Sequence, residues 1–171
     1  MNYKKIISCL LLVVLAACSP KTSTMVTKDK DGSKMLVGTF TRDALMNDPA
    51  FSWFKTGYNK YKPATVPVSV ISKLSKSITI EVFGGTWCSD THELLPAFYK
   101  VMDAAHISDA QITLHLVNRE KKAKDGSTDK YKIVSVPTFV VMINGVQAGR
   151  VVESVKKSIE ADIAEILTDK N

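Results

Sequence analysis

Cysteine is scarce in this sequence, and the scarcity limits the chemistry open to the chain. The 171 residues contain 3 cysteines, Cys9, Cys18 and Cys88. Cys9 lies in an N-terminal stretch with the features of a cleaved targeting segment, and Cys18 directly follows that stretch, where we expect a lipid to block its thiol. Cys88 is then the only free thiol of the processed chain, which excludes an internal disulfide. In an oxidising compartment, a single unpaired cysteine indicates intermolecular pairing or a reactive thiol, unless it is an inert buried side chain.

A long apolar run is also missing. The apolar run near the N-terminus, residues 6–15, follows two lysines and is shorter than the about 20 residues that a spanning helix needs. Positive charge, a short apolar core and small residues before a cysteine are typical of a secretory signal. The sequence LAAC, which ends at Cys18, resembles the bacterial lipobox, whose cysteine is lipidated. We expect a signal peptide over residues 1–17, and a lipidated cysteine with a flexible tether over residues 18–34. An uncleaved anchor is the alternative.

A strong excess of one charge is absent as well. The formal net charge is +6, and the basic residues are spread along the chain. The densest basic run, residues 119–124, contains Glu120 and falls in an expected loop. A solvated loop explains this run better than a nucleic-acid site does, so no nucleic-acid partner is predicted.

The segment FGGTWCSDTHELLP, residues 83–96, places Cys88 between a β-rich run and an amphipathic helix. A helix N-terminus has unpaired N–H groups and a positive potential, which favour a thiolate. The Thr91 hydroxyl is placed to donate a hydrogen bond to that thiolate, or Thr91 simply starts the helix. His92 would add positive charge when protonated, or it is a surface residue. Asp90 opposes the thiolate but suits the first turn of a helix. We expect Cys88 to be reactive.

Hydrophobic periodicity predicts the other elements. Asp48 and Pro49 form a helix-start signal. An aromatic stripe follows, and it is formed by Phe51, Phe54, Tyr58 and Tyr61. Such a stripe is typical of core packing rather than of a ligand platform. The elements expected after it are a short helix near residues 68–74, a strand over 78–83, a helix that contains Pro96, a strand over 111–117, a charged loop over 118–130, strands over 138–143 and 146–152, and a final helix capped by Ser154.

This order of elements, with these local sequences, resembles the thioredoxin fold. Trp87 and Cys88 stand where that family has the Trp-Cys pair that opens its CxxC motif. Pro96 lies where thioredoxins kink the same helix. Val136 and Pro137, which are followed by a strand and a hairpin turn, are similar to the family's cis-proline loop.

The resemblance implies an α/β fold with a mixed central sheet flanked by helices. It covers about residues 74–167, within an expected thioredoxin-like domain over residues 76–171. Residues 35–75 would be an N-terminal helical extension, with a short strand expected over residues 35–40. In the family, the cis-proline packs beside the active cysteine, and the backbone before it pairs with an extended substrate. The resemblance assigns these roles to Pro137 and Val136, and it assigns a substrate-binding role to Trp87.

Two positions depart from the thioredoxin pattern. The second cysteine of CxxC is replaced by Thr91, and a dithiol reductase uses that thiol to resolve its mixed disulfide. The family's buried acid would fall on the strand at Val82. Glu81 is adjacent, but it points to the opposite face of a strand. Both departures argue against ordinary dithiol turnover.

Two functions follow as hypotheses. The first is a membrane-anchored protein in which Cys88 exchanges with protein or small-molecule thiols and disulfides, with an external thiol to resolve the product. The second is a thioredoxin-fold binding module without turnover. Either would be held in the cell envelope by Cys18, on the periplasmic face. Ser19 favours the outer membrane, because Asp at this position commonly signals inner-membrane retention.

A metal site is a third possibility, formed by Cys88 and His92 at i and i+4. Two ligands without others at ligand spacing are a weak signal. His106 and His115 are expected on separate elements. We therefore predict no metal and no other cofactor.

Overall fold

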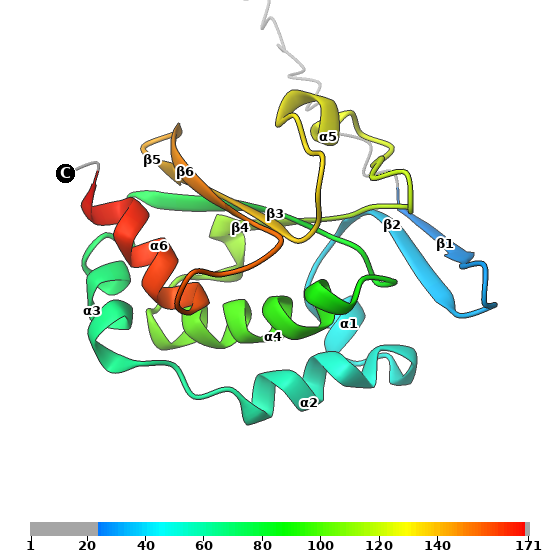
Figure 1. Ribbon diagram of the computed structural model, residues 1–171, viewed down its shortest axis with the longest axis horizontal. Coiled ribbons are helices and arrows are strands. Elements are labelled where there is room, and N and C mark those ends of the chain that lie inside the picture. The colour runs from blue at the N-terminus through cyan, green and yellow to red at the C-terminus, as the bar shows by residue number, and fades with distance from the viewer. Residues whose placement is uncertain (1–23, 170–171) are drawn as a thin grey trace, which may run out of the picture.

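The computed structural model describes residues 24–169. The predicted signal peptide and Cys18 lie outside these residues. The described chain forms a mixed six-stranded sheet with its longer helices on one face (Figure 1). The elements in chain order are β1 (Met25–Lys28), β2 (Lys34–Phe40), α1 (Asp43–Met46), η1 (Pro49–Phe51), α2 (Ser52–Lys60), α3 (Thr65–Lys73), β3 (Ile78–Gly84), α4 (Ser89–Ala104), η2 (Asp109–Gln111), β4 (Ile112–Leu116), α5 (Ser127–Lys130), β5 (Thr138–Ile143), β6 (Val146–Val152) and α6 (Ile159–Thr168).

The strands lie in the order β1-β2-β4-β3-β5-β6. β3 and β4 are parallel and are joined through α4, whereas all other neighbouring strands are antiparallel. This confirms the predicted thioredoxin-like α/β fold with a mixed sheet. β3 is a central strand between β4 and β5, and it leads directly into the segment that carries Cys88.

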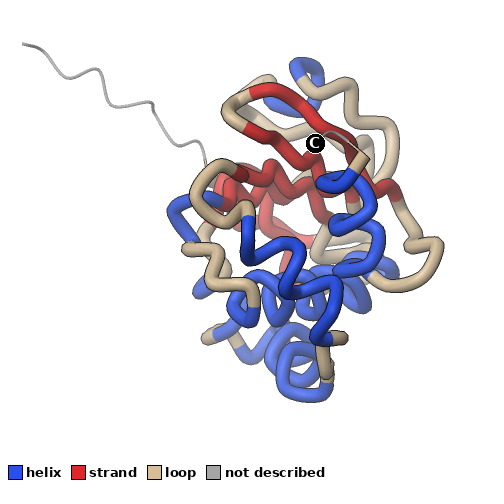
Figure 2. Tube along the Cα trace, turned by 90° about the vertical axis from the view of Figure 1, so that its left-hand side faces the viewer, coloured by secondary structure: helices blue, strands red, loops and turns tan. Residues whose placement is uncertain are grey.

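The main core lies between the sheet and the helices. Figure 2 shows the longer helices gathered on one side of the strands. Ile80 and Val82 point to this side from β3, where they pack with Leu95 and Phe98 of α4, and all four are at most 1 % exposed. Alternation along β3 therefore produces the core face.

The predicted aromatic stripe forms part of this core. Asp48 caps η1 by accepting a hydrogen bond from the Ala50 N–H at 3.0 Å. Phe54 of α2 is fully buried. A Cβ atom added at Gly57 would lie 3.0 Å from the ring of Pro96, so the glycine allows α2 to approach α4 closely at Pro96.

The opposite face of the sheet is covered by a loop rather than by long helices. We call residues 118–137 the covering loop; this segment contains α5 and lies above the sheet in Figure 1. Beneath it is a second, smaller apolar cluster of Phe83, Val117, Val136 and Val140. Cys88 packs against this smaller cluster.

A polar clamp ties the covering loop to the sheet. The buried His115 ring of β4 lies between two carboxylates, with Nε2 2.7 Å from Glu81 and Nδ1 3.1 Å from Asp125. Asp125 also accepts a hydrogen bond from the Thr39 hydroxyl of β2 at 3.0 Å. Burial favours the neutral form of Glu81, but the hydrogen bond and electrostatic attraction of His115, with smaller contributions from Tyr131 and Lys130, together outweigh burial and lower the pKa of Glu81. The clamp thus joins the loop to three strands.

Two sequence expectations were wrong in detail. Residues 18–34 were expected to form a flexible tether, but Met25–Lys28 form β1, because they pair antiparallel with β2 across a turn at Gly32. Ser154 was expected to cap the last helix. The cap is Ser158, because its hydroxyl accepts from the Ala161 N–H. Asp162 holds the backbone before that cap in a loop by accepting the N–H groups of residues 156 and 157.

The segment over residues 35–75 is helical from α1 onward, but it begins with β2, which hydrogen-bonds to β4 in the main sheet. Within residues 24–169, no helix has the length and apolar character needed to cross a membrane.

The clamp predicts a stability that depends on pH. Burial acts to raise the pKa of Asp125, but hydrogen bonds from Ser127 and Thr39 and the electrostatic attraction of His115 together outweigh it and lower the value from 3.8 to about 2. A carboxyl whose pKa is lowered by folding stabilises the fold at pH values above its pKa in the unfolded chain. This contribution is lost as the pH falls from about 4 through about 2. After allowance for partial exposure, we expect a loss of about 1 kcal/mol.

Denaturant unfolding at several pH values between about 5 and about 2 measures this loss, and Asp125→Asn should remove it. The matched control is Asp129→Asn, at an exposed ion pair with Lys122 in the same loop, which should keep the wild-type pH dependence. An Asp125→Asn protein with the wild-type pH dependence would contradict the assignment.

Candidate functional site

The end of β3 and the start of α4 position Cys88. β3 ends at Gly84, and a short turn follows in which the Cys88 N–H donates to the Gly85 carbonyl at 3.0 Å. Cys88 is the N-cap of α4, a helix of 16 residues, and no side chain caps this end by a hydrogen bond. The half-buried sulfur therefore lies where the unpaired N–H groups of the first turn and the helix dipole favour negative charge.

The loop before β5 faces the sulfur. The Val136–Pro137 peptide bond is cis, as the resemblance implies. The Cys88 Sγ lies 3.4 Å from the Val136 carbonyl oxygen, to which the thiol donates. The Pro137 carbonyl accepts from the Glu153 N–H at 2.8 Å, which fixes this loop against the end of β6. The structure thus brings together the cysteine and the two loop residues that were predicted from sequence.

Thr91 and Val82 occupy the two positions that depart from the thioredoxin pattern. Thr91 is fully buried, and its hydroxyl accepts a hydrogen bond from the Gly85 N–H at 3.2 Å. Thr91 therefore supports the turn beside Cys88, and donation to the thiolate remains a prediction. Val82 is fully buried in the main core, whereas Glu81 points to the other face and pairs with His115.

Trp87 lies flat against the turn. Its indole Nε1 donates to the Val117 carbonyl at 3.0 Å, and the Arg119 guanidinium lies 5.1 Å from the ring. A Cβ atom added at Gly85 would lie 2.7–3.0 Å from ring atoms of Trp87. Gly85 is therefore required for the close approach of the indole to the backbone.

His92 is half-buried rather than a free surface residue. Its Nε2 donates to the Thr86 carbonyl at 2.7 Å, and its ring stacks on Trp53 of α2, with centroids 4.1 Å apart and planes at 17°. Asp90 is exposed in the first turn of α4. His106 lies in the turn after α4, whereas His115 lies on β4. Within the described residues, no group of three or more His, Cys, Asp or Glu side chains could hold a metal ion.

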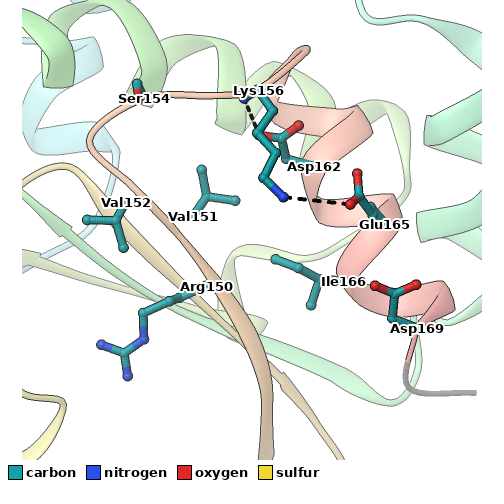
Figure 3. A pocket seen from close by; sticks show the side chains of 9 residues that line it. All are labelled: Arg150, Val151, Val152, Ser154, Lys156, Asp162, Glu165, Ile166 and Asp169. Carbon is teal, nitrogen blue, oxygen red and sulfur yellow. Dashed lines mark hydrogen bonds and ion pairs between the residues drawn. The ribbon is translucent and has the colours of Figure 1, made fainter.

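A surface hollow of about 400 Å³ lies elsewhere, between β6 and α6 (Figure 3). Its polar groups bind one another: the Lys156 N–H donates to Asp162 at 2.7 Å, and the Lys156 ammonium lies 3.7 Å from Glu165. Neither Cys88 nor Pro137 lines it, so we do not assign the hollow to the thiol chemistry.

Several residues that support the Cys88 turn, directly or through one other side chain, were not predicted from the sequence. Arg119 was assigned to a solvated loop, Trp53 lay unremarked within the aromatic helix, and Asp29 was assigned to the tether. These contacts join segments far apart in the chain and have no local sequence pattern.

The comparisons with known proteins agree with this fold. The thioredoxin family model matches residues 68–165, more than half of the chain, and the chain belongs to the thioredoxin family. Membership supports a role of the thiol–disulfide oxidoreductase kind, with thiols or disulfides as the general class of substrate. A comparison with curated proteins gives no match.

Several solved structures are similar to this chain. A protein of unknown function from Pseudomonas aeruginosa superposes with a TM-score of 0.52 at 14% identity, over 75% of this chain and 87% of that chain. A thioredoxin from Fasciola hepatica has a TM-score of 0.40 at 16% identity, over 60% and 89%. Thioredoxin O2 from Arabidopsis thaliana has a TM-score of 0.39 at 16% identity, over 59% and 83%.

The packing of the indole yields a prediction. Gly85→Ala should displace the Trp87 ring, break its hydrogen bond to Val117 and lower the free energy of unfolding by about 1–3 kcal/mol. Denaturant unfolding measures the loss. In a Trp87→Leu background, Gly85→Ala should lower the free energy of unfolding much less, because the new Cβ atom no longer meets the indole ring. Equal costs in both backgrounds would show that the indole does not require Gly85.

Proposed function

We propose that this chain is a membrane-anchored thioredoxin-like protein that acts in thiol–disulfide exchange through one reactive cysteine, Cys88. The observation that carries the proposal is the placement of the Cys88 sulfur at the N-terminus of α4, 3.4 Å from the Val136 carbonyl beside a cis-proline. Helix dipole and unpaired N–H groups favour the thiolate, which is the nucleophile in exchange.

The reaction has two displacements. The Cys88 thiolate attacks one sulfur of a disulfide, forms a mixed disulfide and releases the other sulfur as a thiolate. An external thiolate then attacks the partner's sulfur in the mixed disulfide, forms a new disulfide and releases Cys88 as a thiolate. Attack on a sulfenic acid instead forms the mixed disulfide with loss of water. Electrons balance without a further cofactor.

The surroundings of Cys88 explain why the second step needs another molecule. Thr91, at the resolving position, is fully buried and has no thiol, and Val82 offers no carboxylate for proton transfer. Glu81 is held by His115 on the other face of the sheet. Val136 would offer its backbone to an extended substrate, with Pro137 and Trp87 flanking the sulfur.

The proposed anchor is a lipidated Cys18, which lies outside the described residues. It would hold the protein in the cell envelope, on the periplasmic face, and Ser19 favours the outer membrane. Support comes from the charged, apolar and small-residue pattern of residues 1–18. Mass spectrometry of the protein purified from membranes tests the anchor, because an unmodified Cys18 would contradict it.

Reactivity of Cys88 is the first test. We use the full chain with Cys9→Ser and Cys18→Ser, purified in detergent, so that Cys88 is the sole thiol. We expect the folded protein to react with an aromatic disulfide at about pH 7 at least tenfold faster than the denatured chain, because the helix N-terminus favours the thiolate. If Cys88 of the folded protein does not react with the aromatic disulfide at any pH up to about 9, the proposed thiol–disulfide exchange is wrong. Cellular function that survives Cys88→Ser would instead favour the binding module.

Restoring the missing thiol is the second test. In the same background, Thr91→Cys should resolve the mixed disulfide internally, at least about tenfold faster than the wild-type residue, because the thiol is intramolecular. Thr91→Val is the matched control: it also removes the hydroxyl that accepts from the Gly85 N–H, but it supplies no thiol. The measurement is the lifetime of the mixed disulfide after excess probe is removed. A lifetime that is equally short in both variants would contradict internal resolution.

A further inference from the structure

We propose that Trp53 and Asp29 are positioning residues for Cys88, and that they act through His92 and Arg119 on the turn of residues 85–88. The inference rests on the proposed thiol exchange. Both residues precede residue 68, where the match to the thioredoxin family begins. The segment before residue 68 would therefore help to position the site.

The first support reaches the turn through Thr86, which is 6% exposed. Its carbonyl accepts from the His92 Nε2–H at 2.7 Å, and its hydroxyl accepts from the Leu36 N–H of β2 at 3.3 Å. The His92 ring lies parallel to the Trp53 indole at 4.1 Å. This stack fixes the orientation of the imidazole and hence the direction of its hydrogen bond.

The second support reaches the turn through Trp87. The Gly85 backbone lies on the indole, and the Arg119 guanidinium lies 5.1 Å from the ring. Two hydrogen bonds of 2.6 Å join Arg119 to both carboxylate oxygens of Asp29, whose side chain is 3% exposed. The hydrogen bond from Arg119 holds the pKa of Asp29 below its ordinary value, which keeps the pair charged.

The two supports meet at the cysteine. Thr86 and Trp87 are the two residues between Gly85, which accepts from the Cys88 N–H, and Cys88 itself. Their position sets where the sulfur lies relative to the Val136 carbonyl and to the first turn of α4. A displacement of about 1 Å at a reacting atom can cost about 100-fold in rate, so these side chains can control reactivity without touching the substrate.

The test uses the full chain with Cys88 as the sole thiol. Trp53→Leu and Asp29→Ala should each slow the reaction of Cys88 with an aromatic disulfide about threefold to tenfold and change the pH profile of the rate. Trp53→Phe keeps a flat ring and should stay within about twofold of wild type. Because the chain has 2 tryptophans, Trp87 is the only one left in Trp53→Phe. Adding Asp29→Ala there should shift its emission.

Two variants serve as controls. Tyr58→Leu removes a partly buried aromatic of α2 that binds Asp103, and Asp129→Ala removes an ion pair of the covering loop. Rates of Trp53→Leu and Asp29→Ala within about twofold of wild type, or an equal loss in the controls, would overturn the positioning proposal. An unreactive wild-type Cys88 would instead overturn the proposed exchange, and this is seen before any variant is compared.

Discussion

The antiparallel pairing of β3 with β5 is the interaction on which the site depends. Its register runs from Ile78 opposite Ile143 to Phe83 opposite Thr138. The strand that leads into the Cys88 turn therefore ends beside the strand that follows Pro137, and residues 48 positions apart in sequence meet through a thiol and a carbonyl. β4 binds the other edge of β3, so this strand cannot shift without breaking two ladders. The cysteine is placed by central strands, which are the most constrained part of such a fold.

The two faces of the sheet contribute differently. Long helices cover one face, and the core between them and the sheet contains most of the buried apolar side chains, whereas the covering loop and a small cluster cover the other face. Cys88 packs on the smaller side. Its surroundings are therefore set by loop packing and by the clamp of His115, Glu81 and Asp125. The buried carboxylate that the family places near its cysteine has no counterpart at Val82, and the adjacent Glu81 serves to anchor the loop.

The sequence predicts the fold well, because the relevant signals are local. Periodicity predicts β5 and β6 with the bounds that the structure shows, and the Asn144–Gly145 turn joins them. The placement of Cys88, Val136 and Pro137 follows from short patterns shared with a family. The supports of the turn could not be predicted. Asp29 and Arg119 are 90 residues apart, and Leu36 and Thr86 are 50 apart. Such pairs form because strands and helices bring them together, and exposed-looking charged or aromatic residues carry no sign of a distant partner.

The single cysteine of the described chain has one further consequence. A dithiol protein can store its oxidised state within itself, with the loss of only two hydrogen atoms. Here Cys88 is the only cysteine among residues 24–169, so any disulfide it forms joins this domain to something beyond it. Formation of such a disulfide would then change the size and the diffusion rate of the species that contains this domain. For such a molecule, the balance between reduced and oxidised forms is also a balance between free and bound.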